Sequence, residues 1–144
     1  MNTSAAEILL VEDDRAEARL ASEAFTEAGV AHRLHVVRDG IEALEFLRHL
    51  GSHATAPRPH LVLLDLNLPR KSGREVLHEI KQDEDLRRIP VIILTTSTAQ
   101  DDITQSYDLQ ANCYIAKPVD MDGFVRVVKS LHGFWLGLAQ LPAA

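Results

Sequence analysis

Residues 61–73 read LVLLDLNLPRKSG, and this stretch decides the fold of the chain. Four apolar residues, 61–64, lead directly to Asp65, and Pro69 and Gly73 follow within eight positions. A continuous apolar run of this length is typical of a strand that is covered on both faces, as strands of parallel sheets are. The sequence therefore predicts a buried strand with a carboxylate at its carboxyl end.

Four further segments have strand character, and most of them are nearly continuous apolar runs: residues 7–12, 33–37, 91–95 and 112–116. Apolar residues at helical spacing lie between several of these segments, within residues 18–28, 41–50, 76–80 and 124–131. Alternation of strands and helices favours right-handed crossovers. We therefore expect an α/β fold, a doubly wound five-stranded parallel sheet with helices on both faces.

The bulk composition indicates an ordinary globular protein with one domain. The chain has 144 residues, of which 46% are hydrophobic and 25% are charged. We expect a flexible segment at residues 1–6, a domain at residues 7–131 and an apolar extension at residues 132–144.

Charge and cysteine content restrict the class of protein further. The formal net charge of -6 argues against direct binding of nucleic acid, which depends on clustered Lys and Arg. The single cysteine, Cys113, lies in an apolar run and suits a reducing compartment. Because we find neither a secretory signal nor an apolar stretch of membrane-spanning length, we expect a soluble, cytoplasmic protein with no membrane contact.

Polar side chains follow the predicted strands at their carboxyl ends, where sites form in doubly wound sheets. Glu12 and Asp13 follow the first strand, Asp65 the third, Thr95 the fourth and Lys117 the fifth. Crowded carboxylates need a cation, and a hard divalent ion such as Mg²⁺ prefers oxygen ligands. Carboxylate, metal, hydroxyl and ammonium together suit a phosphoryl group, which predicts an aspartyl phosphate on Asp65.

These residues resemble the receiver domain of two-component response regulators. The resemblance covers roughly residues 7–131 and rests on Leu10-Val11-Glu12-Asp13-Asp14, Leu64-Asp65 with Pro69 and Gly73, Thr95, and Tyr114 with Lys117-Pro118. It implies a flavodoxin-like receiver fold in which Asp65 is the phosphoacceptor and Mg²⁺ is held by Glu12, Asp13, Asp65 and the carbonyl of Asn67. Asp14 we interpret instead as an acid that serves the start of the following helix.

The resemblance also assigns roles in phosphoryl transfer and in the response to it. It implies that Lys117 pairs with the phosphoryl oxygens, with a cis bond to Pro118, and that Thr95 donates its hydroxyl to the phosphoryl group. Thr95 and Tyr114 would then form a two-state switch. The chain would be a regulatory phosphoacceptor rather than an enzyme acting on a separate substrate.

A closer likeness lies in residues 67–77, 106–114 and 134–142, which look like the single-domain regulators that pair with bacterial phytochromes. It implies a phytochrome histidine kinase as phosphoryl donor, in a light-signalling pathway. Because we expect no DNA-binding domain in this chain, its output would pass through a downstream partner protein.

The apolar extension has two possible explanations. Phe134, Trp135, Leu138 and Leu141 would form a homodimer interface, which is the explanation we prefer, or the segment would fold back on its own domain as a longer final helix.

Three other functional classes share part of this residue pattern. A haloacid-dehalogenase-like phosphatase shares the aspartate, Mg²⁺, hydroxyl and lysine, but it needs a second acid where this chain has Asn67. A nucleotide-binding protein would need a Gly-rich turn where Glu12, Asp13 and Asp14 stand. A phosphorylation-independent interaction module would not need the five site residues, and the presence of all five argues against this class: Glu12, Asp13, Asp65, Thr95 and Lys117.

Overall fold

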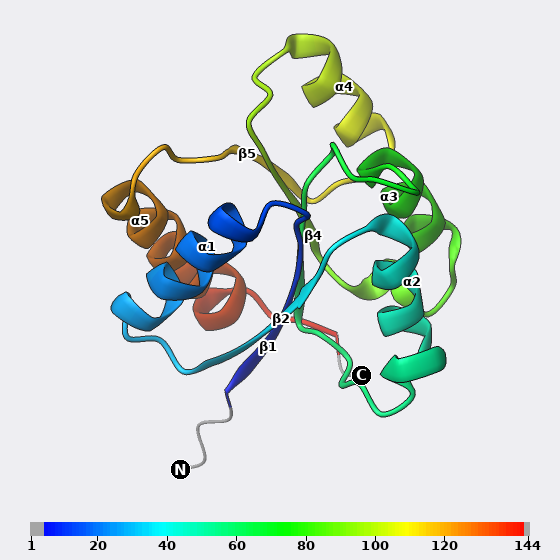
Figure 1. The fold of residues 1–144 in the computed structure, drawn as a ribbon, viewed down its shortest axis with the longest axis horizontal. Helices are drawn as coiled ribbons and strands as arrows, with labels where there is room; N and C mark the ends of the chain where they lie inside the picture. Colours follow the sequence, from blue (N-terminus) through cyan, green and yellow to red (C-terminus); the bar gives the residue numbers. More distant parts are fainter. Residues whose placement is uncertain (1–4, 143–144) are drawn as a thin grey trace.

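The computed structural model describes residues 5–142, and within them five parallel strands form one sheet (Figure 1). The strands are β1 (Ala6–Val11), β2 (His32–Val37), β3 (Leu61–Leu64), β4 (Val91–Thr95) and β5 (Cys113–Ala116). Their spatial order is β2-β1-β3-β4-β5. The predicted doubly wound parallel sheet is therefore confirmed.

Helices cover both faces of the sheet. The α-helices are α1 (Arg15–Glu27), α2 (Gly40–Arg48), α3 (Gly73–Gln82), α4 (Gln100–Asp108) and α5 (Met121–Leu131), and short helical turns are η1 (Gly51–His53) and η2 (Leu86–Arg88). Figure 1 shows α1 and α5 on one side of the sheet and α2 and α3 on the other, with α4 beyond α3. This three-layer arrangement explains why the central strands contain continuous apolar runs at residues 8–11, 61–64 and 91–94.

Alternate residues of the strands divide the core into two halves. Leu9 of β1 packs in the half that contains Phe46 of α2 and Ile80 of α3. Its neighbour Ile8 packs in the other half, with Phe124 of α5. Because strand side chains alternate between faces, each half requires apolar residues at every second position.

The strand order reverses between β1 and β3, and this reversal creates the crevice where sites form in such sheets. Val11 of β1 stands opposite Leu64 of β3 in the register. The backbone N–H of Asp65 donates to the carbonyl oxygen of Val11 at 3.2 Å. The residues that follow the two strands, Glu12 and Asp65, are therefore neighbours at the carboxyl edge of the sheet.

The loop between β3 and α3 is held against the sheet by a close backbone approach. The N–H of Gly73 donates to the carbonyl oxygen of Leu66 at 2.9 Å. A side chain at position 73 would overlap the backbone oxygen of Asp65, so only glycine fits there. Ser72 caps α3 in a capping box with Glu75, which fixes the end of the loop.

Two elements differ from expectation. Helix α4 was not indicated by any apolar pattern, because Ser106 is its only buried residue. The chain beyond α5 continues as a π-helix, η3 (His132–Leu138), which leads the chain back beside the amino ends of the strands.

None of the helices in the described part of the chain is long and apolar enough to cross a membrane. Most of the predicted flexible segment 1–6 lies outside the described residues, although Ala6 already pairs with His32.

Candidate functional site at the carboxyl edge of the sheet

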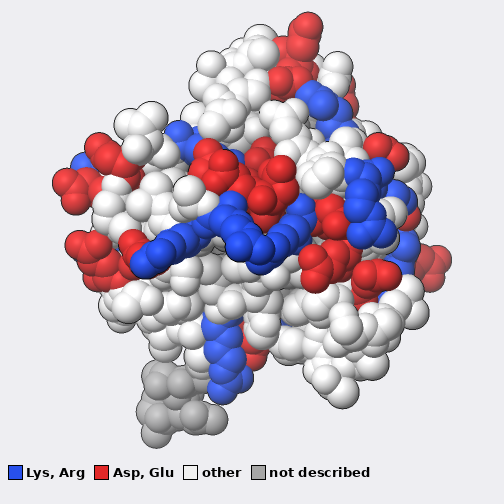
Figure 2. Space-filling model, in the orientation of Figure 1, with Lys and Arg blue, Asp and Glu red and all other residues white. Residues whose placement is uncertain are grey.

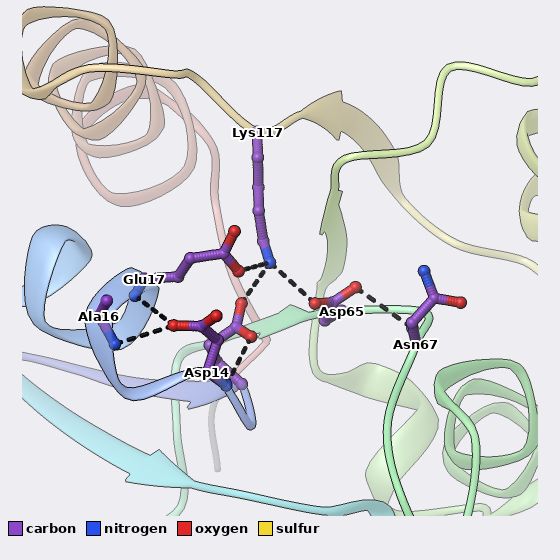
Figure 3. Close-up of polar contacts among 7 residues, drawn as sticks. Asp14, Ala16, Glu17, Asp65, Asn67 and Lys117 are labelled. Carbon is purple, nitrogen blue, oxygen red and sulfur yellow. Dashed lines mark hydrogen bonds and ion pairs between the residues drawn. The ribbon is translucent and has the colours of Figure 1, made fainter.

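The structure brings three of the predicted site residues into direct contact around one ammonium group (Figure 3). The Nζ of Lys117 lies 2.8 Å from Oδ2 of Asp65 and also contacts Oε1 of Glu12. A third carboxylate, that of Glu17, lies 2.6 Å from the same Nζ. The side chains of Glu12, Asp65 and Lys117 are only 3%, 8% and 5% exposed, so these ion pairs are shielded from water.

Each of these side chains is positioned by the end of a secondary-structure element. Glu12 follows β1 and accepts a hydrogen bond from the N–H of Asp14 at 3.1 Å. Lys117 follows β5, and its N–H donates to the carbonyl oxygen of Thr95 at 2.7 Å. The bond between Lys117 and Pro118 is trans, contrary to the cis bond that the resemblance implied, and Lys117 reaches Asp65 from this conformation.

Burial and ion pairing act in opposite directions on this group of charges. Burial raises the pKa of Glu12 to about 7, against the lowering effect of Lys117. Burial alone would lower the pKa of Lys117, but the hydrogen bonds to Asp65, Glu12 and Glu17 raise it above its usual value. The raised pKa of Lys117 means that it keeps its positive charge, and the raised pKa of Glu12 means that it can bind a proton near neutral pH.

Three carboxylates at this edge are close enough to share one metal ion. Oxygen atoms of Glu12, Glu17 and Asp65 all lie within 4.8 Å of one another. Carboxylate oxygens are the ligands that hard divalent cations such as Mg²⁺ and Mn²⁺ prefer. In Figure 2 acidic side chains gather on the surface over the start of α1 and the end of β1, a charge distribution that attracts cations. The residues present therefore fit a divalent ion.

The metal ligands predicted from the sequence are only partly in this cluster. Asp13 lies in the predicted place after β1, but its side chain is exposed and is not in the group formed by Glu12, Glu17 and Asp65. Asn67 lies two residues after Asp65, and its N–H donates to Oδ1 of Asp65 at 3.2 Å. Metal binding by Asp13 and by the Asn67 carbonyl stays a prediction.

Sequence reasoning missed Glu17. It lies in the first turn of α1, whose N-cap is Asp14: the Asp14 carboxylate accepts hydrogen bonds from the N–H groups of Ala16 and Glu17 at 2.9 and 3.1 Å (Figure 3). Asp14 thus serves the helix start, as interpreted from the sequence. The available signal for Glu17 was an acid one helical turn beyond Glu12 and Asp13, a position where acids also occur simply to complement the helix dipole.

Thr95 lies at the end of β4 and carries an unpartnered hydroxyl. Its side chain is fully buried, and its Oγ1 has no hydrogen-bond partner within residues 5–142. Buried hydroxyl groups are normally satisfied, so this hydroxyl is free to donate to a group that binds at the edge of the sheet. An acceptor bound beside Asp65 is the kind of partner that this hydroxyl needs.

A second polar network connects Tyr114 to the loop after Thr95. The hydroxyl of Tyr114 donates to the carbonyl oxygen of Ser97 at 2.9 Å. The Ser97 hydroxyl in turn donates to Asp102 of α4, which forms an ion pair with Arg74 of α3. The side chain of Tyr114 therefore points inward, and its hydroxyl contacts the loop that follows Thr95, the other residue of the predicted switch.

The apolar extension divides into packed and exposed residues. Trp135 packs against the half of the core formed with α1 and α5, and its ring meets that of Phe134 edge to face at 5.1 Å. Leu141 is partly buried near His60, at the amino ends of the strands. Phe134 and Leu138 remain 51% and 70% exposed. The extension thus folds back in part and still presents an apolar surface.

Comparison with known proteins adds independent information. The sequence profile of the response regulator receiver domain matches residues 8–129. The response regulator Rcp1 of Synechocystis sp. (strain ATCC 27184 / PCC 6803 / Kazusa) is 49% identical over 137 residues, which are 95% of this chain and 93% of Rcp1. These shares mean that the likeness extends beyond the domain profile into the apolar extension.

Two solved structures are similar over nearly their whole length. The phosphorylated cyanobacterial phytochrome response regulator RcpA superposes with a TM-score of 0.90 at 51% identity, covering 97% of this chain and 100% of RcpA. The Mn²⁺-bound form of Rcp1 superposes with a TM-score of 0.86 at 48% identity, covering 96% of this chain and 99% of Rcp1. The first of these proteins is phosphorylated and the second holds a divalent metal ion.

Proposed function

Because the chain belongs to the response regulator receiver domain family, we propose that Asp65 accepts a phosphoryl group from a phosphohistidine of a phytochrome-type histidine kinase. The observation that carries this proposal is the buried carboxylate of Asp65, paired with Lys117 at 2.8 Å beside two further carboxylates. The likeness to Rcp1 and RcpA supports the choice of kinase class.

The residues at the site have distinct tasks in this transfer. An oxygen of Asp65 attacks the phosphorus, an O–P bond forms, the N–P bond to histidine breaks, and the nitrogen keeps the electron pair. Lys117 neutralises the phosphoryl oxygens, and the unpaired hydroxyl of Thr95 donates a hydrogen bond to one of them. A divalent ion, which we propose to be Mg²⁺ held by Glu12 and Asp65 with Asp13 and Asn67, would supply further charge stabilisation when bound.

The response to phosphorylation would begin at Thr95. A hydrogen bond from its hydroxyl to the phosphoryl group would pull on the loop that follows β4. That loop carries Ser97, whose carbonyl oxygen holds the Tyr114 hydroxyl in this structure. We therefore propose Thr95 and Tyr114 as the two-state element through which a downstream partner protein senses phosphorylation.

The apolar extension supports a second copy of this chain as a partner. Phe134 and Leu138 expose apolar side chains on η3, where Trp135 and Leu141 anchor the segment to its own domain. An exposed apolar surface that is anchored to its own domain can pair with its own copy across a two-fold axis. The proposed homodimer interface is centred on the two exposed residues.

The phosphoryl-transfer proposal is tested by intact mass after incubation with acetyl phosphate and Mg²⁺. We expect a phosphoryl adduct that is absent from Asp65→Asn and from a sample with chelator, and retained in Asp108→Asn, which changes an exposed acid on α4. An adduct that persists in Asp65→Asn would refute the assignment of Asp65.

The kinase class is tested separately, with a purified autophosphorylated phytochrome histidine kinase and an unrelated histidine kinase as donors. Transfer to this chain should be faster from the phytochrome kinase. Equal or slower transfer would remove the phytochrome assignment and leave the phosphoacceptor role standing.

A further inference from the structure

The Lys117 ammonium already donates hydrogen bonds to Glu17 and Asp65 and forms an ion pair with Glu12 in this structure. An ammonium group has three N–H donors. Three carboxylates lie around it, those of Glu12, Glu17 and Asp65 (Figure 3). Phosphorylation converts the Asp65 carboxylate into an acyl phosphate, whose several charged phosphoryl oxygens take over its contact with Lys117. These oxygens then compete with Glu12 and Glu17 for the remaining N–H donors of the same ammonium.

The two competing carboxylates differ in how easily they can leave. The Glu17 side chain is 35% exposed, whereas that of Glu12 is almost completely buried. A buried carboxylate that loses its counter-ion has a high free energy, because protein hydrates it poorly. An exposed carboxylate loses much less, because water replaces the ion pair. Glu17 is thus the partner that can release Lys117 at the lowest cost.

The position of Glu17 on the helix supports this role. It lies in the first turn of α1, where unpaired backbone N–H groups favour a negative charge even without a nearby lysine. Its backbone is held by the carboxylate of Asp14, so the side chain can swing away while the helix start stays in place.

We infer that Glu17 is a positioning residue that competes with the phosphoryl group for the ammonium of Lys117 and so sets how readily Asp65 is occupied. The inference rests on the proposed function. In the unmodified protein Glu17 holds Lys117 at the α1 side of the site. On phosphorylation Lys117 exchanges Glu17 for a phosphoryl oxygen, and Glu17 returns to water.

The test uses fluoroberyllate, an analogue of the phosphoryl group that binds to a carboxylate. It is titrated at saturating Mg²⁺ into the full chain and followed by amide chemical shifts. Glu17→Gln should lower the half-saturating fluoroberyllate concentration by about two- to fivefold, the size expected for losing one partly exposed competing ion pair. Glu23→Gln removes the same charge from an exposed position on the same helix and should leave it unchanged.

The Mg²⁺ dissociation constant of each variant, measured by calorimetry without fluoroberyllate, separates the possible roles of Glu17. A change of less than about threefold in Glu17→Gln, together with tighter fluoroberyllate binding, supports competition for Lys117. Weaker binding of both probes would overturn the inference and make Glu17 a metal ligand. Unchanged fluoroberyllate binding would overturn it as well. Failure of the wild-type chain to bind fluoroberyllate would instead count against the proposed function.

Discussion

The ammonium of Lys117 lies 2.8 Å from the carboxylate of Asp65, although 52 residues separate them in the sequence. The two residues follow different strands, β5 and β3, which are not adjacent because β4 lies between them. The long lysine side chain crosses this gap and reaches a site that also holds Glu12 and Glu17. One cation therefore balances several acids in the metal-free protein.

Removing this cation should destabilise the metal-free protein. Lys117→Met leaves the buried carboxylates of Glu12 and Asp65 without a counter-ion, and we expect a loss of about 3 kcal/mol in the free energy of unfolding. Urea denaturation measures this loss. Saturating Mg²⁺ should recover part of it, and Lys129→Met, at an exposed position on α5, should show almost none. Equal stability of the two variants would contradict the proposed charge balance.

Binding of Mg²⁺ should depend on pH through Glu12. Its pKa is raised by burial to about 7 from 4.5, so the proton competes with the metal below pH 7. We expect calorimetry to give an affinity roughly tenfold or more weaker at pH 5.5 than at pH 7.5. In Glu12→Gln this dependence should largely disappear. A pH-independent affinity in the wild-type chain would be inconsistent with a protonated Glu12.

The raised pKa of Glu12 also makes the stability of the folded protein depend on pH. Between pH 4.5 and about pH 7 the folded protein binds more protons at Glu12 than the unfolded chain does. This group therefore makes the metal-free protein less stable as pH rises through that window. The slope should be absent from Glu12→Gln in urea denaturation across the same pH range.

Removing the hydroxyl of Thr95 should stabilise the fold and weaken phosphorylation of Asp65. Thr95→Val keeps the shape and removes a buried hydroxyl that has no partner within residues 5–142, so we expect a gain of about 1 kcal/mol in the free energy of unfolding. The same change removes the donor proposed for the phosphoryl group. Intact mass should therefore reveal a lower yield or a shorter lifetime of the adduct. Thr96→Val, at an exposed neighbouring position, is the matched control, and a Thr95→Val adduct with normal yield and lifetime would argue against the role of the hydroxyl.

The proposed dimer should depend on exposed residues of η3. The double variant Phe134→Ser and Leu138→Ser should be monomeric by light scattering at concentrations where the wild-type chain is dimeric, with little change in stability. Val119→Ser, at a highly exposed apolar position before α5, should remain dimeric. A dimer that survives the double change would place the interface elsewhere. Deleting the whole extension is a poorer test, because the partly buried Trp135 packs against the core and its loss would also affect stability.

The fold was predictable where burial dominates the choice of residue. The central strands β1, β3 and β4 lie between helices on both faces, so their buried runs, residues 8–11, 61–64 and 91–94, are apolar at every position and stand out in the sequence. The carboxyl edge followed from the same pattern, because Asp65 and Lys117 each come directly after an apolar run. Helix α4 could not be found this way, since a helix with one buried residue needs no apolar stripe.

The details of the site were less predictable because they depend on side-chain direction. The sequence places Glu12 and Asp13 together, yet only Glu12 turns inward to Lys117, and Asp13 stays exposed. Glu17 reaches Lys117 only because α1 begins immediately beside the crevice. The inward position of Tyr114 likewise depends on a contact with a backbone oxygen, that of Ser97, which no residue pattern encodes.

The acidic site around Lys117 and the apolar extension lie at opposite ends of the strands. Lys117 precedes α5 at the carboxyl end of the sheet, and η3 follows α5 near the amino ends of the strands. This separation would let the proposed assembly and the proposed phosphorylation evolve independently, because substitutions in the extension would change partner preference while the residues around Asp65 stay the same. It also gives protein engineers a place to attach reporters, since a label on the extension would stay remote from Asp65.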